Sequence, residues 1–206
     1  MDIKRLCGIK KKKLMIIGAS GHGKVVSEVA KSFYDIIDYL DDNNQKAIGK
    51  VCDFKKYIDE YDFIVAIGNN EIRERITQCL LEFNANVVNV ISAFSYISSD
   101  LKLGVGNVVM PGCIIQPGCV IGDGVIVNTS ATIDHENIIG SYAHISVGSH
   151  LAGNVHIGKR TFVGVGTNII NNIEVTGDCV IGAGSTVLSN IIENGTYVGT
   201  PAKKIK

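Results

Sequence analysis

The sequence predicts two domains of different architecture, a small α/β domain followed by a parallel β-helix. The first observation is that every sixth residue from Ile91 to Val187 is Ile, Leu or Val, without interruption. A period of six is neither the helical period of 3.6 nor the strand period of 2, and it is typical of hexapeptide β-helices. The second observation is that residues 14–90 alternate short apolar runs with helix-period segments, which is typical of a parallel sheet.

These two rhythms also divide the chain. We expect a short N-terminal tail, a Rossmann-like nucleotide-binding domain, a β-helix and a C-terminal tail, at residues 1–13, 14–90, 91–190 and 191–206. A length of 206 residues suits one solenoid with a small companion domain.

Composition excludes several classes of protein. The 20 Lys and Arg residues balance the 20 Asp and Glu residues, so nucleic-acid binding by phosphate neutralisation has no support. Six cysteines without a C-x-x-C pair or a secretory leader predict reduced thiols in a cytoplasmic protein. The basic run from Lys10 to Lys13 precedes only four apolar residues, which is too short for a membrane span, and we expect no membrane contact.

The first domain shows four apolar runs and two helix-period segments. We expect strands at 14–18, 36–40, 63–67 and 87–90, and helices over about 25–33 and 71–83. This order resembles half of a doubly wound nucleotide-binding fold, in which ligands lie at the carboxyl ends of the strands.

Polar residues follow three of these strands. The turn Gly18–Gly23 reads GASGHG, and its glycines and helix N-terminus suit a phosphate, although the spacing is not that of a dinucleotide turn and a purely structural turn is the alternative. Asp41 and Asp42 follow the second strand, where they either accept hydrogen bonds from a ribose or base edge, or cap a turn. Gly68 opens the third group, Gly-Asn-Asn.

The second domain should be a triangular prism in which three six-residue units form a coil. We expect roughly five coils, with the aliphatic residue of each unit pointing to the axis and a small residue two positions earlier near the corner. This aliphatic ladder consists of Ile91, Ile97, Leu103, Val109, Ile115, Ile121, Val127, Ile133, Ile139, Ile145, Leu151, Ile157, Val163, Ile169, Val175, Ile181 and Val187. Because the ladder has no gap, the prism should eject no long loop.

Histidines on this prism are the candidates for chemistry. His135 lies two residues after the ladder residue Ile133, at a corner where side chains can leave the prism, and Glu136 or Asp134 could orient its imidazole. Adjacent strand residues point to opposite faces, so a contact between His135 and Glu136 requires corner geometry. A surface role for the pair is the alternative.

Three further histidines repeat at a spacing of six. His144, His150 and His156 should lie on the three faces of one coil and diverge, so a single chain cannot gather them around a metal ion. We therefore expect no metal, although neighbouring chains could bring such histidines together.

Several segments carry a resemblance over nearly the whole chain. GASGHG, LDD, AIGNNEIR, NTSATIDHENIIGSYAHISVGSHLAGNVHIGK and YVGTPAK resemble the bacterial nucleotide-sugar acetyltransferases, and within them those of the UDP-N-acetylbacillosamine type. The resemblance implies a homotrimer of left-handed parallel β-helices with active sites between subunits. It also implies acetyl transfer from acetyl-CoA to the C4 amine of a UDP-4-amino-4,6-dideoxy-N-acetyl sugar. No cysteine or serine occupies a position that suggests an acyl-enzyme, so we expect direct transfer in a ternary complex.

The resemblance assigns roles to individual residues. His135 would be the general base with Glu136 as its partner. Acetyl-CoA would contact His144, Val165 and Ala183, and the UDP-sugar would contact Ser20, Gly21, His22, Asp41, Asp42 and Gly68. Asn128 would border the acetyl acceptor, with a structural asparagine on the β-helix as the alternative.

Relatives with the same solenoid and histidine leave other functions open. O-acetylation of a sialic acid would use the same base on a hydroxyl group, and perosamine-type N-acetylation would use another nucleotide sugar. A solenoid scaffold or metal protein without transferase activity is a third alternative.

Overall fold

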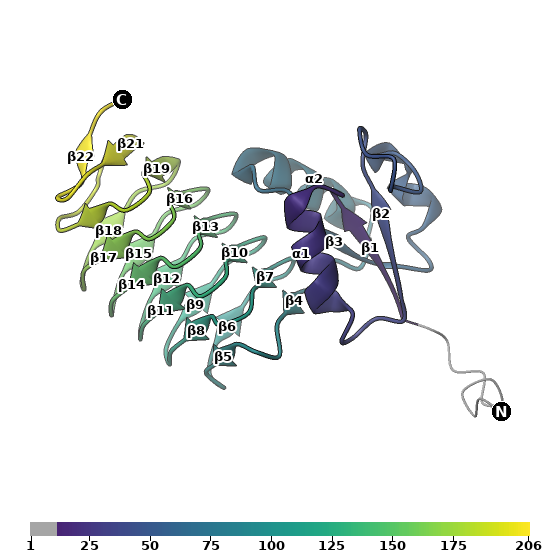
Figure 1. Ribbon diagram of the computed structural model, residues 1–206, viewed down its shortest axis with the longest axis horizontal. Coiled ribbons are helices and arrows are strands. Elements are labelled where there is room, and N and C mark those ends of the chain that lie inside the picture. Colours follow the sequence, from purple (N-terminus) through teal and green to yellow (C-terminus); the bar gives the residue numbers. More distant parts are fainter. Residues whose placement is uncertain (1–11) are drawn as a thin grey trace.

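The protein is described by a computed structural model over residues 12–206. An α/β domain sits at one end of a long β-helix (Figure 1). The expected tail at residues 1–13 falls outside the described residues except for Lys12 and Lys13, and Lys13 already belongs to the first strand. Cys7 is also outside them.

The N-terminal domain is a three-stranded parallel sheet in the order β2-β1-β3. Its elements are β1 (Lys13–Ile17), α1 (Gly21–Ala30), β2 (Ile36–Leu40), the 3₁₀ helix η2 (Val51–Lys56), β3 (Asp62–Val65) and α2 (Asn70–Glu82). Successive residues of β1 alternate between two cores, as strand geometry requires. Leu14 and Ile16 pack in a core continuous with that of the solenoid, whereas Met15 and Ile17 pack with Phe54 in a separate one.

The fourth run expected in this sheet, residues 87–90, is divided between the domains. Val87 makes an isolated parallel bridge to Phe63 of β3. Val90 instead begins β4 (Val90–Ile91), the first strand of the solenoid. In the sequence this apolar run looks like one strand because both halves are buried. In the structure each half pairs with a different sheet.

The predicted ladder describes the solenoid strand by strand. Each strand from β4 to β20 ends on a ladder residue, and the strands after β4 are β5 (Tyr96–Ile97), β6 (Lys102–Leu103), β7 (Val108–Val109), β8 (Ile114–Ile115), β9 (Val120–Ile121), β10 (Ile126–Val127), β11 (Thr132–Ile133), β12 (Ile138–Ile139), β13 (His144–Ile145), β14 (His150–Leu151), β15 (His156–Ile157), β16 (Phe162–Val163), β17 (Asn168–Ile169), β18 (Glu174–Val175), β19 (Cys179–Ile181) and β20 (Thr186–Val187). The ladder is half-buried in the first coil, and from Val109 onward it is buried. No insertion interrupts the prism.

Three parallel sheets form the faces of the prism. The first face contains β4, β7, β10, β13, β16 and β19, the second contains β5, β8, β11, β14, β17 and β20, and the third contains β6, β9, β12, β15 and β18. We call the corner between the first and second faces the first edge, that between the second and third faces the second edge, and that between the third and first faces the third edge. These strands make nearly six coils, slightly more than the sequence suggested.

Residues 191–206, expected as a tail, extend the solenoid. β21 (Gly195–Val198) pairs with β19 and so continues the first face, and β22 (Lys203–Lys204) pairs antiparallel with β21. β21 departs from the period of six, so the hexapeptide repeat did not predict this strand.

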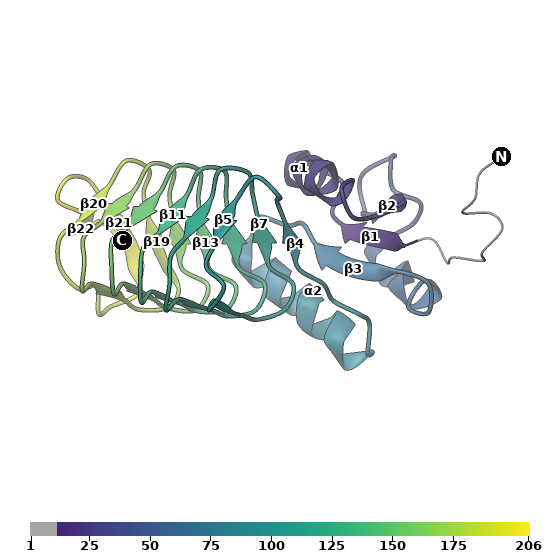
Figure 2. The same ribbon diagram turned by 90° about the horizontal axis from the view of Figure 1, so that it is seen from below.

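The two domains are joined by α1, whose Val26, Val29 and Ala30 share the hydrophobic core of the solenoid, and by polar contacts of α2. Figure 2 shows α2 beside the first coils, and its Asn70 amide donates to the carbonyl of Arg160 on the third edge at 2.8 Å. The guanidinium of Arg160 pairs with Glu74 of α2 at 2.8 Å. Within residues 12–206, no helix has the length and apolar character that crossing a membrane requires.

Candidate active site

The turn Gly18–Gly23 joins β1 to α1 with its backbone tightly packed. Gly18 has φ of 105°, a conformation that favours glycine. A side chain at Gly23 would overlap the carbonyl oxygen of Gly18. Ser20 occupies the N-cap of α1 without a side-chain capping hydrogen bond, so its hydroxyl and the first N–H groups of α1 remain available to an anion.

A cavity of about 930 Å³ opens at the carboxyl ends of the three strands. Ser20, Asp41, Asp42 and Gly68 all line it, so the structure brings these four predicted residues together. Gly21 starts α1 beside them. The site therefore lies where ligands bind in doubly wound folds.

The two aspartates have different tasks. Asp41 accepts hydrogen bonds from the backbone N–H groups of Ala19 (2.8 Å) and Asn43 (2.9 Å), and these bonds lower the pKa of its carboxyl group. Both of its oxygens thus hold the local backbone. Asp42 accepts from Val51 through one oxygen, at 3.0 Å, which leaves its other oxygen for a ligand.

The remainder of this cavity is lined mainly by apolar and aromatic side chains, with Lys55 and Arg75 among them. Phe54 of η2 and Phe83 after α2 meet edge to face at 5.6 Å, and the ammonium of Lys55 lies 3.8 Å from the centre of the Phe83 ring. A polar end beside a flat apolar end suits a ligand that combines phosphate and sugar with an aromatic base.

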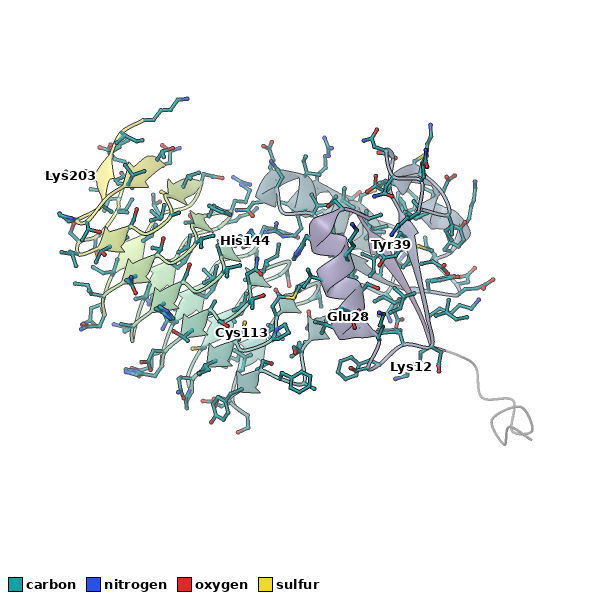
Figure 3. The ribbon with its side chains drawn as sticks, viewed as in Figure 1. Lys12, Glu28, Tyr39, Cys113, His144 and Lys203 are labelled. Carbon is teal, nitrogen blue, oxygen red and sulfur yellow. The ribbon has the colours of Figure 1, made fainter. Side chains whose placement is uncertain are left out.

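Two further predicted residues, His144 and Asn128, meet where the domains join. His144, on β13 of the first face, lies on the side of the solenoid toward the N-terminal domain (Figure 3). Its Nε2 is 3.1 Å from the amide nitrogen of Asn128 on the first edge, and that amide is oriented by the hydrogen bond from the Thr129 N–H to its oxygen. The amide donates, so the proton of the neutral imidazole is on Nδ1.

Burial keeps both junction histidines neutral. Burial first, and then the charge of Arg73, lower the pKa of His22 to about 4. The same two causes and the proximity of His22 lower the pKa of His144 to about 3, against a smaller opposing effect of the Gly68 backbone. Nδ1 of His144 and Nε2 of His22 have no hydrogen-bond partner within residues 12–206. Buried unpartnered nitrogens are costly and mark places where a ligand or water binds.

Gly68 links this junction to a second cavity. That cavity, of about 620 Å³, lies between the start of α2 and the first face and is lined by Asn70, Phe162 and Val180. Gly68 lines both cavities. The nucleotide-sized cavity therefore borders the part of the solenoid that carries His144.

His135 and Glu136 form a separate pair on the second edge. Nδ1 of His135 is 3.1 Å from the Glu136 carboxylate. The neighbours meet because Glu136 has φ of 61°, the corner geometry that the pairing requires. Asp134 instead accepts from the His135 backbone N–H at 2.7 Å and does not orient the ring. The imidazole is 58% exposed and turns Nε2 away from the carboxylate.

Beneath this imidazole lies Gly153, one coil further along. A methyl group built at Gly153 would lie 2.5 Å from both Cε1 and Nε2 of His135. The ring therefore rests on a stretch of backbone without a side chain.

Val165 and Ala183 occupy successive corners of the first edge and are exposed. Gly166 and Gly184 follow them with φ of 66° in both, and no atom lies within 4 Å of where a side chain would begin. This edge is a smooth ledge that begins near Asn128, and it can accept an extended ligand.

The residues predicted on the solenoid thus form two groups within one chain, apart from those that line the cavity of the N-terminal domain. Asn128, His144, Val165 and Ala183 lie on the first face and first edge, whereas His135 lies on the second edge. His150 and His156 lie on the second and third faces, as expected. Within residues 12–206, no three His, Cys, Asp or Glu side chains are grouped to hold a metal ion.

Sequence reasoning missed Arg73 and Gly153. Arg73 lies on the buried face of α2 with Thr77 and Leu80. In the sequence it stands out as a charged residue at a helical position that faces the core, and this could have indicated its role. Gly153 lies 18 residues after His135, which is the length of one coil, and that spacing was the signal for a neighbour of the imidazole.

Comparison with known proteins agrees with this architecture. Residues 13–80 match the family model described as PglD N-terminal domain. UDP-N-acetylbacillosamine N-acetyltransferase of Bacillus subtilis is 32% identical over 111 residues, which cover 48% of this chain and 51% of that protein. The chain spans about half the length, or less, of the curated relatives it matches.

Solved structures resemble the whole chain. The acetyltransferase domain of PglB from Neisseria gonorrhoeae has a TM-score of 0.92 and 36% identity, covering 94% of this chain and all of that one, and it was also solved with acetyl coenzyme A. A histidine-to-alanine mutant of GDP-perosamine N-acetyltransferase from Caulobacter crescentus, with CoA and GDP-perosamine, has a TM-score of 0.90 and 30% identity over 93% of this chain and 95% of that one. The predicted fold class, a Rossmann-like domain followed by a left-handed parallel β-helix, is confirmed.

Proposed function

The chain belongs to the family of nucleotide-sugar N-acetyltransferases that includes UDP-N-acetylbacillosamine N-acetyltransferase, and from this we propose that it acetylates the C4 amine of a UDP-4-amino-4,6-dideoxy-N-acetyl sugar. It is an acetyl-CoA-dependent sugar N-acetyltransferase, with acetyl-CoA as its co-substrate. The observation that carries the proposed mechanism is the His135–Glu136 pair, in which Nδ1 is engaged at 3.1 Å and Nε2 is free.

His135 acts as the general base. The Glu136 carboxylate accepts a hydrogen bond from the Nδ1–H group. This bond fixes the tautomer and leaves the Nε2 lone pair for the substrate. The amine nitrogen attacks the thioester carbonyl, forming a C–N bond, and its proton passes to Nε2. The C–S bond then breaks, and the CoA sulfur takes the proton back from the imidazolium. Transfer is direct, without an acetylated enzyme.

The sugar nucleotide binds in the cavity of the N-terminal domain. The turn residues Ser20, Gly21 and His22 hold the diphosphate at the N-terminus of α1, where unpaired N–H groups favour an anion. The free oxygen of Asp42 accepts from the ribose or base, whereas Asp41 supports the turn. Gly68 directs the sugar toward His144 and Asn128, whose amide borders the acetyl acceptor.

Acetyl-CoA lies along the first edge. Val165 is 51% exposed, and the ledge it forms with Ala183 offers backbone groups and apolar surface to a pantetheine arm. His144, at the start of this ledge, carries a free Nδ1–H toward the junction.

A homotrimer completes the active site. In one chain the base and the two ligand sites occupy different edges of the prism, so a neighbouring chain must present its second edge to the first edge of this one. Three chains around a common axis satisfy this head-to-tail contact and close.

Turnover of a His135→Ala variant tests the mechanism. We expect binding of both ligands to persist while turnover falls by roughly two to four orders of magnitude. His156→Ala, on the third face, serves as the matched control and should retain activity. Near-wild-type turnover of His135→Ala would refute the assignment, and a stable acetylated protein after mixing with acetyl-CoA alone would refute direct transfer.

A second nucleotide sugar is favoured by one observation. The similarity to GDP-perosamine N-acetyltransferase spans both domains, so a GDP-linked amino sugar is the alternative acceptor. A panel of UDP-, GDP- and CMP-sugars assayed with acetyl-CoA separates these two from O-acetylation of a sialic acid.

A further inference from the structure

Arg73, in the first turn of α2, is the largest side chain among those that are fully buried in the described part of the chain, with 0% exposure. It makes six hydrogen bonds, which run from Nε to the Gly124 carbonyl (2.6 Å), from Nη1 to the carbonyls of Ile67 (2.9 Å) and Gly68 (3.3 Å), and from Nη2 to Asn70 Oδ1 (2.8 Å) and the carbonyls of Tyr142 (2.7 Å) and Ala143 (3.2 Å). The planar fork of a guanidinium is suited to so many acceptors at once.

These acceptors belong to both domains. Ile67 and Gly68 form the loop after β3, whereas Gly124, Tyr142 and Ala143 are on the third edge in two successive coils. One side chain therefore ties the loop at the nucleotide cavity to the solenoid beside His144. Glu74 also joins the domains, but through Lys159 and Arg160 and without touching that loop.

Arg73 does this without a carboxylate. Its six acceptors are five carbonyl groups and one amide, and the adjacent Glu74 is paired with Lys159 and Arg160. The charge of this buried cation reaches both junction histidines, where it adds to burial, the larger cause, in lowering the pKa of His22 and of His144.

We propose that Arg73 is a positioning residue that fixes the Gly68 loop, and with it the nucleotide-sugar cavity, against the solenoid strand that carries His144. This inference rests on the proposed function for the identity of the ligand. The residue contacts no substrate and acts through the Ile67 and Gly68 carbonyls that it holds.

Two variants separate this role from general stabilisation. Arg73→Lys keeps the charge but cannot reach both sets of carbonyls with one ammonium group. We expect its dissociation constant for UDP, measured by calorimetry, and its KM for the nucleotide sugar to rise roughly 10- to 100-fold, an effect of the size that losing one or two hydrogen bonds to a charged group has on an equilibrium. The KM for acetyl-CoA should change less, because the ledge at Val165 is built from the solenoid alone.

Glu74→Gln is the matched control. It breaks a neighbouring interdomain contact but lines neither cavity, so it should lower the melting temperature while UDP binds within about twofold of wild type. Unchanged UDP affinity in folded Arg73→Lys, or an equal loss in Glu74→Gln, would overturn the proposal.

Amide hydrogen exchange of the wild-type chain tests whether Arg73 holds the junction rigid, even if Arg73→Lys does not fold. The N–H groups of Ile72 and Arg73 bond to Asn69 at the start of α2, where helices normally fray. We expect them to exchange as slowly as the solenoid amides, and fast exchange would contradict the positioning role of Arg73. A wild-type chain that binds no nucleoside diphosphate would count against the proposed function, and the exchange rates would still decide the role of Arg73.

Discussion

Replacing Gly153 by Ala should impair His135, the proposed general base, while leaving the fold intact. The added methyl group would lie 2.5 Å from Cε1 and Nε2 of His135, whereas ordinary contacts to such a carbon begin at 3.4 Å. Gly153 does not have a positive φ, so alanine fits the backbone. The imidazole, exposed and held mainly by Glu136, must move by about 1 Å, which typically costs about 100-fold in rate, or about 2.7 kcal/mol of transition-state stabilisation.

Steady-state kinetics and calorimetry measure this effect. We expect kcat to fall about 100-fold in Gly153→Ala, with unchanged dissociation constants for both ligands. The melting temperature should stay the same or rise slightly, because alanine restricts the unfolded chain. In the His135→Ala background the second substitution should cost nothing further, since there is no imidazole to displace. A wild-type kcat for Gly153→Ala would refute the role of this backbone surface.

Two other predictions concern charge. His22 and His144 have pKa values lowered to about 4 and about 3, so both stay neutral in the folded chain at pH 5 and gain protons on unfolding below pH 6.5. The free energy of unfolding should therefore fall as the pH drops, by about 2 kcal/mol per histidine at pH 5. Urea titrations at pH 7 and 5 measure this, and a His22→Gln variant with the same pH dependence as wild type would contradict it. Asp41→Ala leaves the buried Ala19 N–H without its partner and should lose about 1–3 kcal/mol of stability. Asp42→Ala should instead weaken UDP binding with little change in melting temperature, and the reverse pattern would show that the two roles are exchanged.

The solenoid was predictable because its constraint is local and repeated. Each ladder residue from Val109 onward is buried, since a period of six leaves one inward position per face. Cys113 and Cys119 are buried as small corner residues, in keeping with packing thiols. The strand β21 was not predicted because it pairs with β19 without following the six-residue repeat.

The sequence predicted a set of candidate site residues but not their arrangement. The motif spacing identified His135 and Glu136, yet their contact depends on the positive φ of Glu136, which is a property of the corner. The burial of His144 depends on the N-terminal domain lying beside the first face. A contact between residues more than 50 positions apart, such as Arg73 with Gly124, has no local signature in a sequence.

The central claim is that His135 of one chain acts on a sugar nucleotide held by another. Oligomers assembled from equal amounts of His135→Ala chains and His22→Ala/Asp42→Ala chains test it, because each variant retains the half of the proposed site that the other lacks. If sites form between chains, random mixing should restore about a quarter of wild-type acetyltransferase activity, since one interface in four joins two intact halves. If each chain carried a complete site of its own, the mixture would be as inactive as the two separate variants.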